Sequence, residues 1–153
     1  MKIKLLVIGK IKEKYWNDAI CEYKKRLNAF CELSLIELKE INTDDINKNI
    51  IEEGRLILNS LKEDDFLITL EILGNEYSSE EFASFINKHY LYDNRTITFV
   101  IGGSNGLSKE VLSRSNMRIS FGRFTYPHQL MRVILLEQIY RAMMINNNRA
   151  YHK

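Results

Sequence analysis

The chain has 153 residues, of which 45% are hydrophobic and 27% charged, and its formal net charge is +2. These values predict one globular domain over residues 1–153, with a core large enough to need no disulfide or structural metal. The apolar runs are too short for a membrane span or a secretion signal. Two isolated cysteines, Cys21 and Cys31, do not indicate a zinc site, and we expect a cytoplasmic protein.

The charges are unevenly distributed along the sequence. Residues 1–26 carry eight Lys or Arg against three acids, and residues 107–153 carry eight against two. Residues 37–82, by contrast, carry thirteen acids against four bases. Two interpretations stay open: either these are ordinary solvated faces, or the two ends form a basic surface for a polyanion.

The first part of the chain alternates between strand and helix patterns. Residues 3–8 predict a buried strand, and apolar side chains at helical spacing over 16–30 predict an amphipathic helix. Residues 33–38 predict a second strand. A helix is expected over about 44–62, although Gly54 within it lowers its helix propensity.

The middle of the chain continues the alternation. Residues 66–70 predict a compact strand, which we expect to be followed by a polar connection. Ser78 and Glu81 have the spacing of a capping box and predict the start of the next helix. Residues 96–101 predict a further buried strand.

The last part of the chain begins with a glycine-rich segment at 102–106. A short helix near 108–114, a strand at 117–121, a loop over 121–126 and a helix over about 127–145 follow. The alternation predicts an α/β fold around a largely parallel sheet. In such sheets ligands bind at the carboxyl ends of strands.

The glycine-rich segment is a weak signal by itself. Glycines at a strand end let the backbone approach a ligand closely. The order Gly102-Gly103-Ser104-Asn105-Gly106 is neither GxGxxG nor a phosphate loop, since no Lys-Ser/Thr follows it. A nicotinamide enzyme or another small-molecule nucleotide enzyme therefore has little support.

The last helix is apolar around most of its circumference. Such a helix is buried on more than one side, either by a second subunit or because it lies at the centre of one chain. Glu137 and Arg141 are four residues apart and can form an ion pair.

The three histidines do not suggest a catalytic triad. His89 shares a helical stripe with Phe85 and is expected in the core. His128 lies in the first turn of the last helix, where it could line a ligand site or cap the helix. His152 lies next to the end of the chain.

Three segments together are far more specific than any of these features. The chain opens MKIKLLVIGKIKEKYWNDAICEYKKRL, continues with FVIGGSNGLSKEVL and ends FTYPHQLMRVILLEQIYRAMMINNNRAYHK. These segments resemble the ribosomal large-subunit methyltransferase H family of the SPOUT superfamily. The resemblance covers essentially the whole chain, although the middle, about 40–63, is shorter than in relatives.

The resemblance implies a fold, a cofactor and an assembly. The fold would be a parallel sheet flanked by helices with a C-terminal trefoil knot, an exception to the rule that chains are not knotted. The chain would form a homodimer. Three strand-end loops would bind S-adenosyl-L-methionine through Leu70, Gly102, Gly103, Phe121, Gly122, Arg123, Phe124, Thr125 and Tyr126.

The implied reaction is methylation of N3 of a pseudouridine in large-subunit (23S) rRNA, in the stem-loop near the decoding region. The implied partner is this rRNA, within the assembled ribosome. His152 would be the base or orienting group, beside Tyr151, with Arg132 and Arg141 as stabilising cations or phosphate ligands. Two alternatives stay open: a methylase of another rRNA or tRNA site, and a non-catalytic dimer that only binds ribosomes.

Overall fold

The computed structural model describes residues 1–151 and contains a five-stranded sheet in the order β2-β1-β4-β3-β5. All neighbouring strands are parallel, which confirms the predicted α/β fold around a parallel sheet. The strands are β1 (Lys2–Ile8), β2 (Glu32–Leu38), β3 (Phe66–Glu76), β4 (Ile97–Ile101) and β5 (Met117–Ser120).

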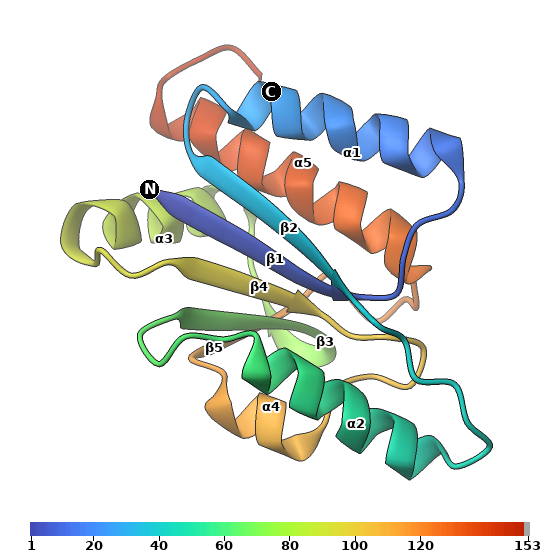
Figure 1. Ribbon diagram of the computed structural model, residues 1–153. Coiled ribbons are helices and arrows are strands. Elements are labelled where there is room, and N and C mark those ends of the chain that lie inside the picture. The colour runs from blue at the N-terminus through green and yellow to red at the C-terminus, as the bar shows by residue number, and fades with distance from the viewer. Residues whose placement is uncertain (152–153) are drawn as a thin grey trace.

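Five helices cover the two faces of the sheet (Figure 1). The last helix, α5, packs between α1 and α3 on one face, while α2 and α4 contact each other on the other face. The helices are α1 (Lys14–Leu27), α2 (Ile46–Asn59), α3 (Ser79–Tyr92), α4 (Lys109–Arg114) and α5 (His128–Asn146).

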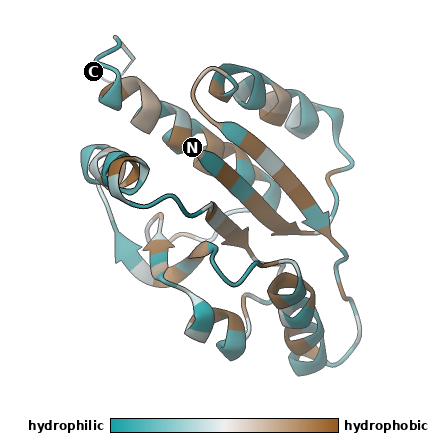
Figure 2. Cartoon of the chain, turned by 60° about the vertical axis from the view of Figure 1, so that its left-hand side comes forward, coloured by the Kyte–Doolittle hydropathy of each residue, from teal (hydrophilic) through white to brown (hydrophobic). Residues whose placement is uncertain are grey.

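The core consists of two apolar clusters separated by the sheet. Side chains alternate along the central strand β1, so Leu5 and Val7 join the cluster under α1, α3 and α5. Leu6 and Ile8 point to the opposite face and join the cluster under α2 and α4. Figure 2 accordingly shows apolar residues concentrated along the strands.

The helix starts follow local chemistry. The predicted capping box of α3 is confirmed, because the Glu81 N–H donates to Ser78 Oγ at 3.1 Å and the Ser78 N–H donates to Glu81 Oε2 at 2.7 Å. Asp45 caps α2 by accepting the N–H of Lys48. Both helices therefore begin where a side chain satisfies the exposed backbone donors.

Strand β3 is longer than predicted, and the expected polar connection directly after Leu70 is wrong. Ile119 of β5 pairs with both Leu70 and Asn75, so residues 71–74 leave the ladder and the strand then resumes. Gly74 allows the close return, since a Cβ there would lie 2.7 Å from the carbonyl carbon of Ile119. The implied knot stays a prediction with which this topology is consistent.

None of the helices over residues 1–151 is both long enough and apolar enough to cross a membrane.

Candidate functional site

A cavity of about 680 Å³ opens at the carboxyl ends of β3, β4 and β5, the edge where the sequence predicted a ligand site. Its volume is in the range of pockets that enclose a small molecule or cofactor. Its walls include all but one of the residues that the resemblance assigned to the cofactor: Leu70, Gly102, Gly103, Phe121, Gly122, Phe124, Thr125 and Tyr126. The exception is Arg123, whose side chain is exposed and does not line the cavity.

The glycine-rich wall follows β4 and is a tight turn packed on itself. The Gly106 N–H donates to the Gly103 carbonyl at 3.2 Å, and Gly106 has a φ of +83°, in the left-handed region. A Cβ on Gly102 would lie 3.0 Å from the Gly106 carbonyl oxygen and from Leu107 Cδ2. A side chain at 102 would therefore crowd the turn itself, and not only an approaching ligand.

The second wall is the segment that joins β5 to α5. Ser120 Oγ donates to the Ile72 carbonyl at 2.9 Å and accepts the Gly122 N–H at 3.1 Å, which fixes this segment against the loop at 71–74. Gly122 has a φ of +97°. The wall thus depends on a hydroxyl that sequence reasoning did not single out.

His128 lines the cavity from the first turn of α5, one of the two roles expected for it. Burial and, to a lesser extent, the nearby Arg132 lower the pKa of His128 below its ordinary value of 6.5. The imidazole is therefore neutral at pH 7 and can donate or accept a hydrogen bond.

Sequence reasoning missed three apolar side chains that line the cavity: Ile72, Leu73 and Met131. Leu73 is 92% exposed and Phe124 is 80% exposed, and Phe124 alone had been assigned to the cofactor. Ile72 and Leu73 continue the apolar pattern of the strand beyond Leu70, which was the available signal. Met131 of α5 completes this apolar lining.

Arg132 is fully buried beneath the cavity and holds the end of β1. Its Nη2 donates to the carbonyls of Ile8 and Gly9 at 2.7 and 2.9 Å, and its Nη1 donates to Glu37 at 3.2 Å. Burial lowers the pKa of the Arg132 guanidinium, against the attraction of Glu37. Arg132 therefore has a structural role, since both of its terminal nitrogens donate hydrogen bonds within the chain.

Tyr151 and Arg141 form a cluster with Glu137 on α5. Arg141 Nη2 donates to Glu137 Oε1 at 2.6 Å, which confirms the predicted ion pair, and Tyr151 Oη donates to the same oxygen at 3.1 Å. Burial and the charge of Glu137 raise the pKa of Tyr151 to about 12. The phenol is therefore protonated at neutral pH and acts as a hydrogen-bond donor, not as a base.

Of the predicted catalytic residues, the three that the structure describes do not line the cavity of their own chain. Tyr151 and Arg141 do not line it, and Arg132 lies behind it. His152 lies outside the described residues.

Comparison with known proteins identifies the family of the chain as a whole. The family model described as "Predicted SPOUT methyltransferase" matches residues 1–152. The chain belongs to this family. Among curated SPOUT relatives, the ribosomal RNA large subunit methyltransferase H of Pediococcus pentosaceus is 50% identical, and that of Lactococcus lactis is 51% identical. Each alignment covers 100% of both chains.

A solved structure shares this fold at low sequence identity. It is described as a probable methylase family protein from Haemophilus influenzae and superimposes with a TM-score of 0.57. The match has 13% identity and covers 99% of this chain and 70% of that chain. The likeness shows that the two chains share a fold.

Proposed function

We propose that this protein is an S-adenosyl-L-methionine-dependent methyltransferase that modifies N3 of a pseudouridine in large-subunit (23S) rRNA. The observation that supports it most directly is the cavity at the carboxyl ends of β3, β4 and β5, in a chain of the SPOUT family. The full-length relatives named ribosomal RNA large subunit methyltransferase H support the RNA substrate. The site of action would be the cytoplasm.

The residues of the cavity fit S-adenosyl-L-methionine. The glycine-rich wall at 102–106 presents backbone close to the cavity, and Leu70, Phe121 and Met131 offer apolar surface for a flat base. Thr125 and the neutral His128 add hydrogen-bonding groups at the opposite wall. When bound, the cofactor supplies a methyl group already activated by its sulfonium.

The acceptor nitrogen needs help of another kind. N3 of pseudouridine is an imide nitrogen that is protonated at neutral pH, so its proton must leave at or before attack. We assign the base or orienting role to His152, whose ordinary pKa is near 6.5. Tyr151, a protonated phenol, would stack on or orient the base, and Arg141 would stabilise negative charge.

Tyr151 and Arg141, which do not line the cavity of their own chain, would meet a cavity only in a homodimer. The outward row of α5 holds the half-buried apolar side chains Leu130, Ile134 and Met144, with the Glu137–Arg141 pair between them. A second copy packed on this row would bring one chain's Tyr151 region towards the partner's cavity. The dimer would therefore complete the site as well as bury the row.

Calorimetry and methyl transfer test the proposal together. Wild-type protein should bind S-adenosyl-L-methionine and transfer its labelled methyl to purified ribosomes. Met131→Trp should fill the cavity and weaken binding by at least about tenfold, equivalent to 1.4 kcal/mol. Tyr90→Trp, on an exposed site of α3, is the matched control and should bind normally. Wild-type protein that binds ribosomes but transfers no methyl would instead favour the non-catalytic alternative.

A further inference from the structure

Two consecutive residues of α2 contact Gly103 in the glycine-rich wall and Ser108, two residues after the wall, from the side away from the cavity. A Cβ on Gly103 would lie 3.1 Å from Glu53 Oε2 and 3.4 Å from Glu53 Oε1. A Cβ on Gly54 would meet Ser108, with Ser108 Cβ 2.8 Å away. Neither Glu53 nor Gly54 lines the cavity itself.

Glu53 is an unusual residue for this position, because its carboxyl is almost completely buried. The residue is 3% exposed; its Oε1 accepts the Ile41 N–H at 2.9 Å, and Oε2 has no hydrogen-bond partner among residues 1–151. Burial raises the pKa of Glu53 above its usual value, although the Ile41 hydrogen bond opposes this. A buried carboxyl with one unpaired oxygen costs free energy, which indicates that Glu53 does more than fill space.

Gly54 is equally unexpected from the sequence, since glycine weakens a helix interior by about 1 kcal/mol relative to alanine. The structure supplies the reason. Ser108 caps α4 by accepting the Val111 N–H at 3.3 Å, and it packs directly on the bare backbone of Gly54. Any side chain at 54 would push α2 and α4 apart.

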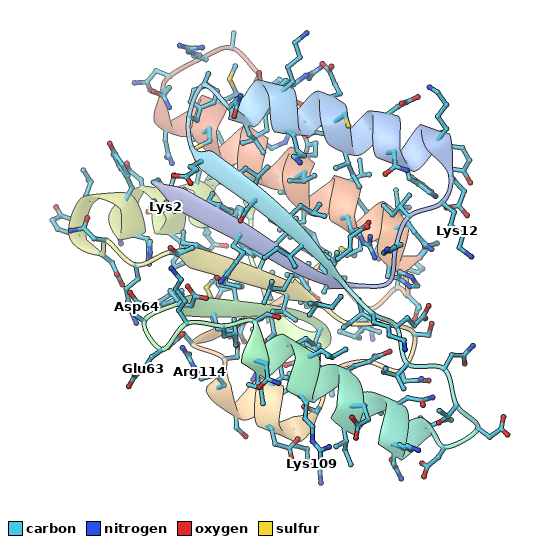
Figure 3. All side chains as sticks on the ribbon, viewed as in Figure 1. Lys2, Lys12, Glu63, Asp64, Lys109 and Arg114 are labelled. Atoms are coloured by element: carbon cyan, nitrogen blue, oxygen red, sulfur yellow. The ribbon has the colours of Figure 1, made fainter. Side chains whose placement is uncertain are left out.

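The far end of α4 is fixed to the same part of the molecule. Arg114 donates to the carbonyls of Glu63 and Asp65, both at 3.0 Å, in the turn that follows α2. Figure 3 shows Arg114 beside Glu63 and Asp64 at this turn. α4 therefore cannot move independently of α2, and its start at Ser108 is a fixed point for the segment that precedes it.

We propose that Glu53 and Gly54 are positioning residues for the cofactor site: they contact Gly103 of the glycine-rich wall and Ser108, which follows the wall at the start of α4, and so set the distance of the wall from the opposite wall. The inference rests on the proposed function for the identity of the ligand. The Gly103–Gly106 turn is closed by the 3.2 Å hydrogen bond from the Gly106 N–H to the Gly103 carbonyl, so the contacts from α2 hold the turn in both its shape and its place. A misplacement of about 1 Å is enough to lose most of the benefit of a positioned site.

A double-mutant cycle tests the Gly54 contact. Gly54→Ala should weaken S-adenosyl-L-methionine binding by about tenfold, because overpacking displaces the start of α4. Ser108→Gly removes the group that clashes, and glycine at an N-cap costs only a few tenths of a kcal/mol. The double variant should therefore recover most of the wild-type affinity. A double variant as weak as Gly54→Ala would overturn the inference, as would a Gly54→Ala protein that binds normally.

Three variants test Glu53. Glu53→Gln keeps the shape and both polar ends, so it should bind S-adenosyl-L-methionine nearly as the wild type does. Glu53→Leu should raise the Kd and KM for the cofactor while kcat at saturation changes little, since no reacting atom is touched. Glu52→Gln is the control, since Glu52 is half-buried on the same turn and pairs with the exposed Arg55 at 2.9 Å. Equal cofactor affinity in a folded Glu53→Leu protein would refute the role.

Hydrogen exchange separates this inference from the proposed function. The Gly106 amide, which donates to Gly103, should exchange faster in Gly54→Ala and slow again in the double variant, with no ligand present. If the wild type binds no S-adenosyl-L-methionine, the proposed function fails. The exchange rate of the Gly106 amide would still show whether α2 holds the glycine-rich wall in place. Unchanged exchange in Gly54→Ala would contradict the inference whatever the ligand.

Discussion

At the scale of single residues, the buried charges are the positions where a substitution should lower the stability of the fold most. Lys4 lies within the sheet, 9% exposed, and its Nζ is 2.6 Å from Oδ2 of Asp65, which is 2% exposed. Burial by itself would raise the pKa of Asp65, but hydrogen bonds from Lys4 and the Lys62 N–H hold it below its usual value. The pair joins β1 to the turn before β3, which the charge pattern of the sequence could not reveal.

Lys4→Met should destabilise the protein by about 3–5 kcal/mol, because it leaves a buried carboxylate without its partner. Lys2→Met is the matched control on the same strand: Lys2 is exposed and 4.0 Å from Glu32, and such surface pairs contribute about 0–1 kcal/mol. Urea unfolding at pH 7 measures both free energies. Similar losses in the two variants would contradict the account.

The loss of unfolding free energy in Lys4→Met should also depend on pH. A carboxyl whose native pKa is lowered stabilises the fold above its unfolded pKa, near 3.9, and loses that contribution as pH falls through the native value. The difference between wild type and Lys4→Met should therefore shrink on acidification. Unfolding curves measured between neutral and acidic pH would show it; a difference independent of pH would argue against the pair.

Deleting residues 151–153 should separate chemistry from cofactor binding. Tyr151 rests on Tyr140 and Glu137 and does not line the cavity, so cofactor affinity and dimerisation should persist. Methyl transfer should fall by at least about 10²-fold, the usual loss when a general base is removed. Single-turnover methylation of ribosomes, alongside calorimetry, measures the two effects. Near-normal transfer would show that this end of the chain takes no part in the reaction.

At the scale of elements, α5 shows why an almost wholly apolar helix is ambiguous in the sequence: it can be covered by a second subunit or lie at the centre of one chain. Leu135 and Ile139 are completely buried in the core of their own chain, between the sheet, α1 and α3. These two residues are therefore not available to a second subunit. An interpretation in which a second subunit alone covers the helix is wrong for this side of α5. The outward row that includes Leu130 and Ile134 stays half-buried and is available for a second copy.

Ile134→Arg should convert the proposed dimer into a monomer, because it places a charge at the centre of the apolar row. Ile51→Arg, the same change on an exposed isoleucine of α2, should leave the dimer intact. Sedimentation at micromolar concentration distinguishes the species. A wild-type monomer under these conditions would refute the homodimer.

Element boundaries were predictable where local chemistry sets them. The capping box at Ser78 and the strand over 96–101 needed only sequence spacing and apolar runs. The return of β3 at Asn75 was not predictable, because it depends on pairing with Ile119, more than forty residues later. Gly54 was visible as an anomaly, but its partner Ser108 was not.

At the scale of the whole molecule, the strand-end rule predicted the edge where the cavity lies, and the family resemblance predicted most of the residues that line it. Parallel strands bring Leu70, Gly102 and Phe121 to one edge, and this follows from the alternation of strand and helix alone. The distance between the two walls depends on tertiary contacts such as Glu53 with Gly103, and the position of Arg132 depends on burial. Those features could not be predicted from the sequence, because they depend on contacts between residues far apart in the chain.

Mass mapping of large-subunit rRNA tests the central claim most directly. Ribosomes from cells that lack this protein should be incubated with the purified wild-type dimer and S-adenosyl-L-methionine carrying an isotopic label in its methyl group. The account predicts one labelled methyl per large-subunit rRNA, on N3 of a pseudouridine in the stem-loop near the decoding region. A label on another nucleotide, or none under conditions where the protein binds the cofactor, would contradict it.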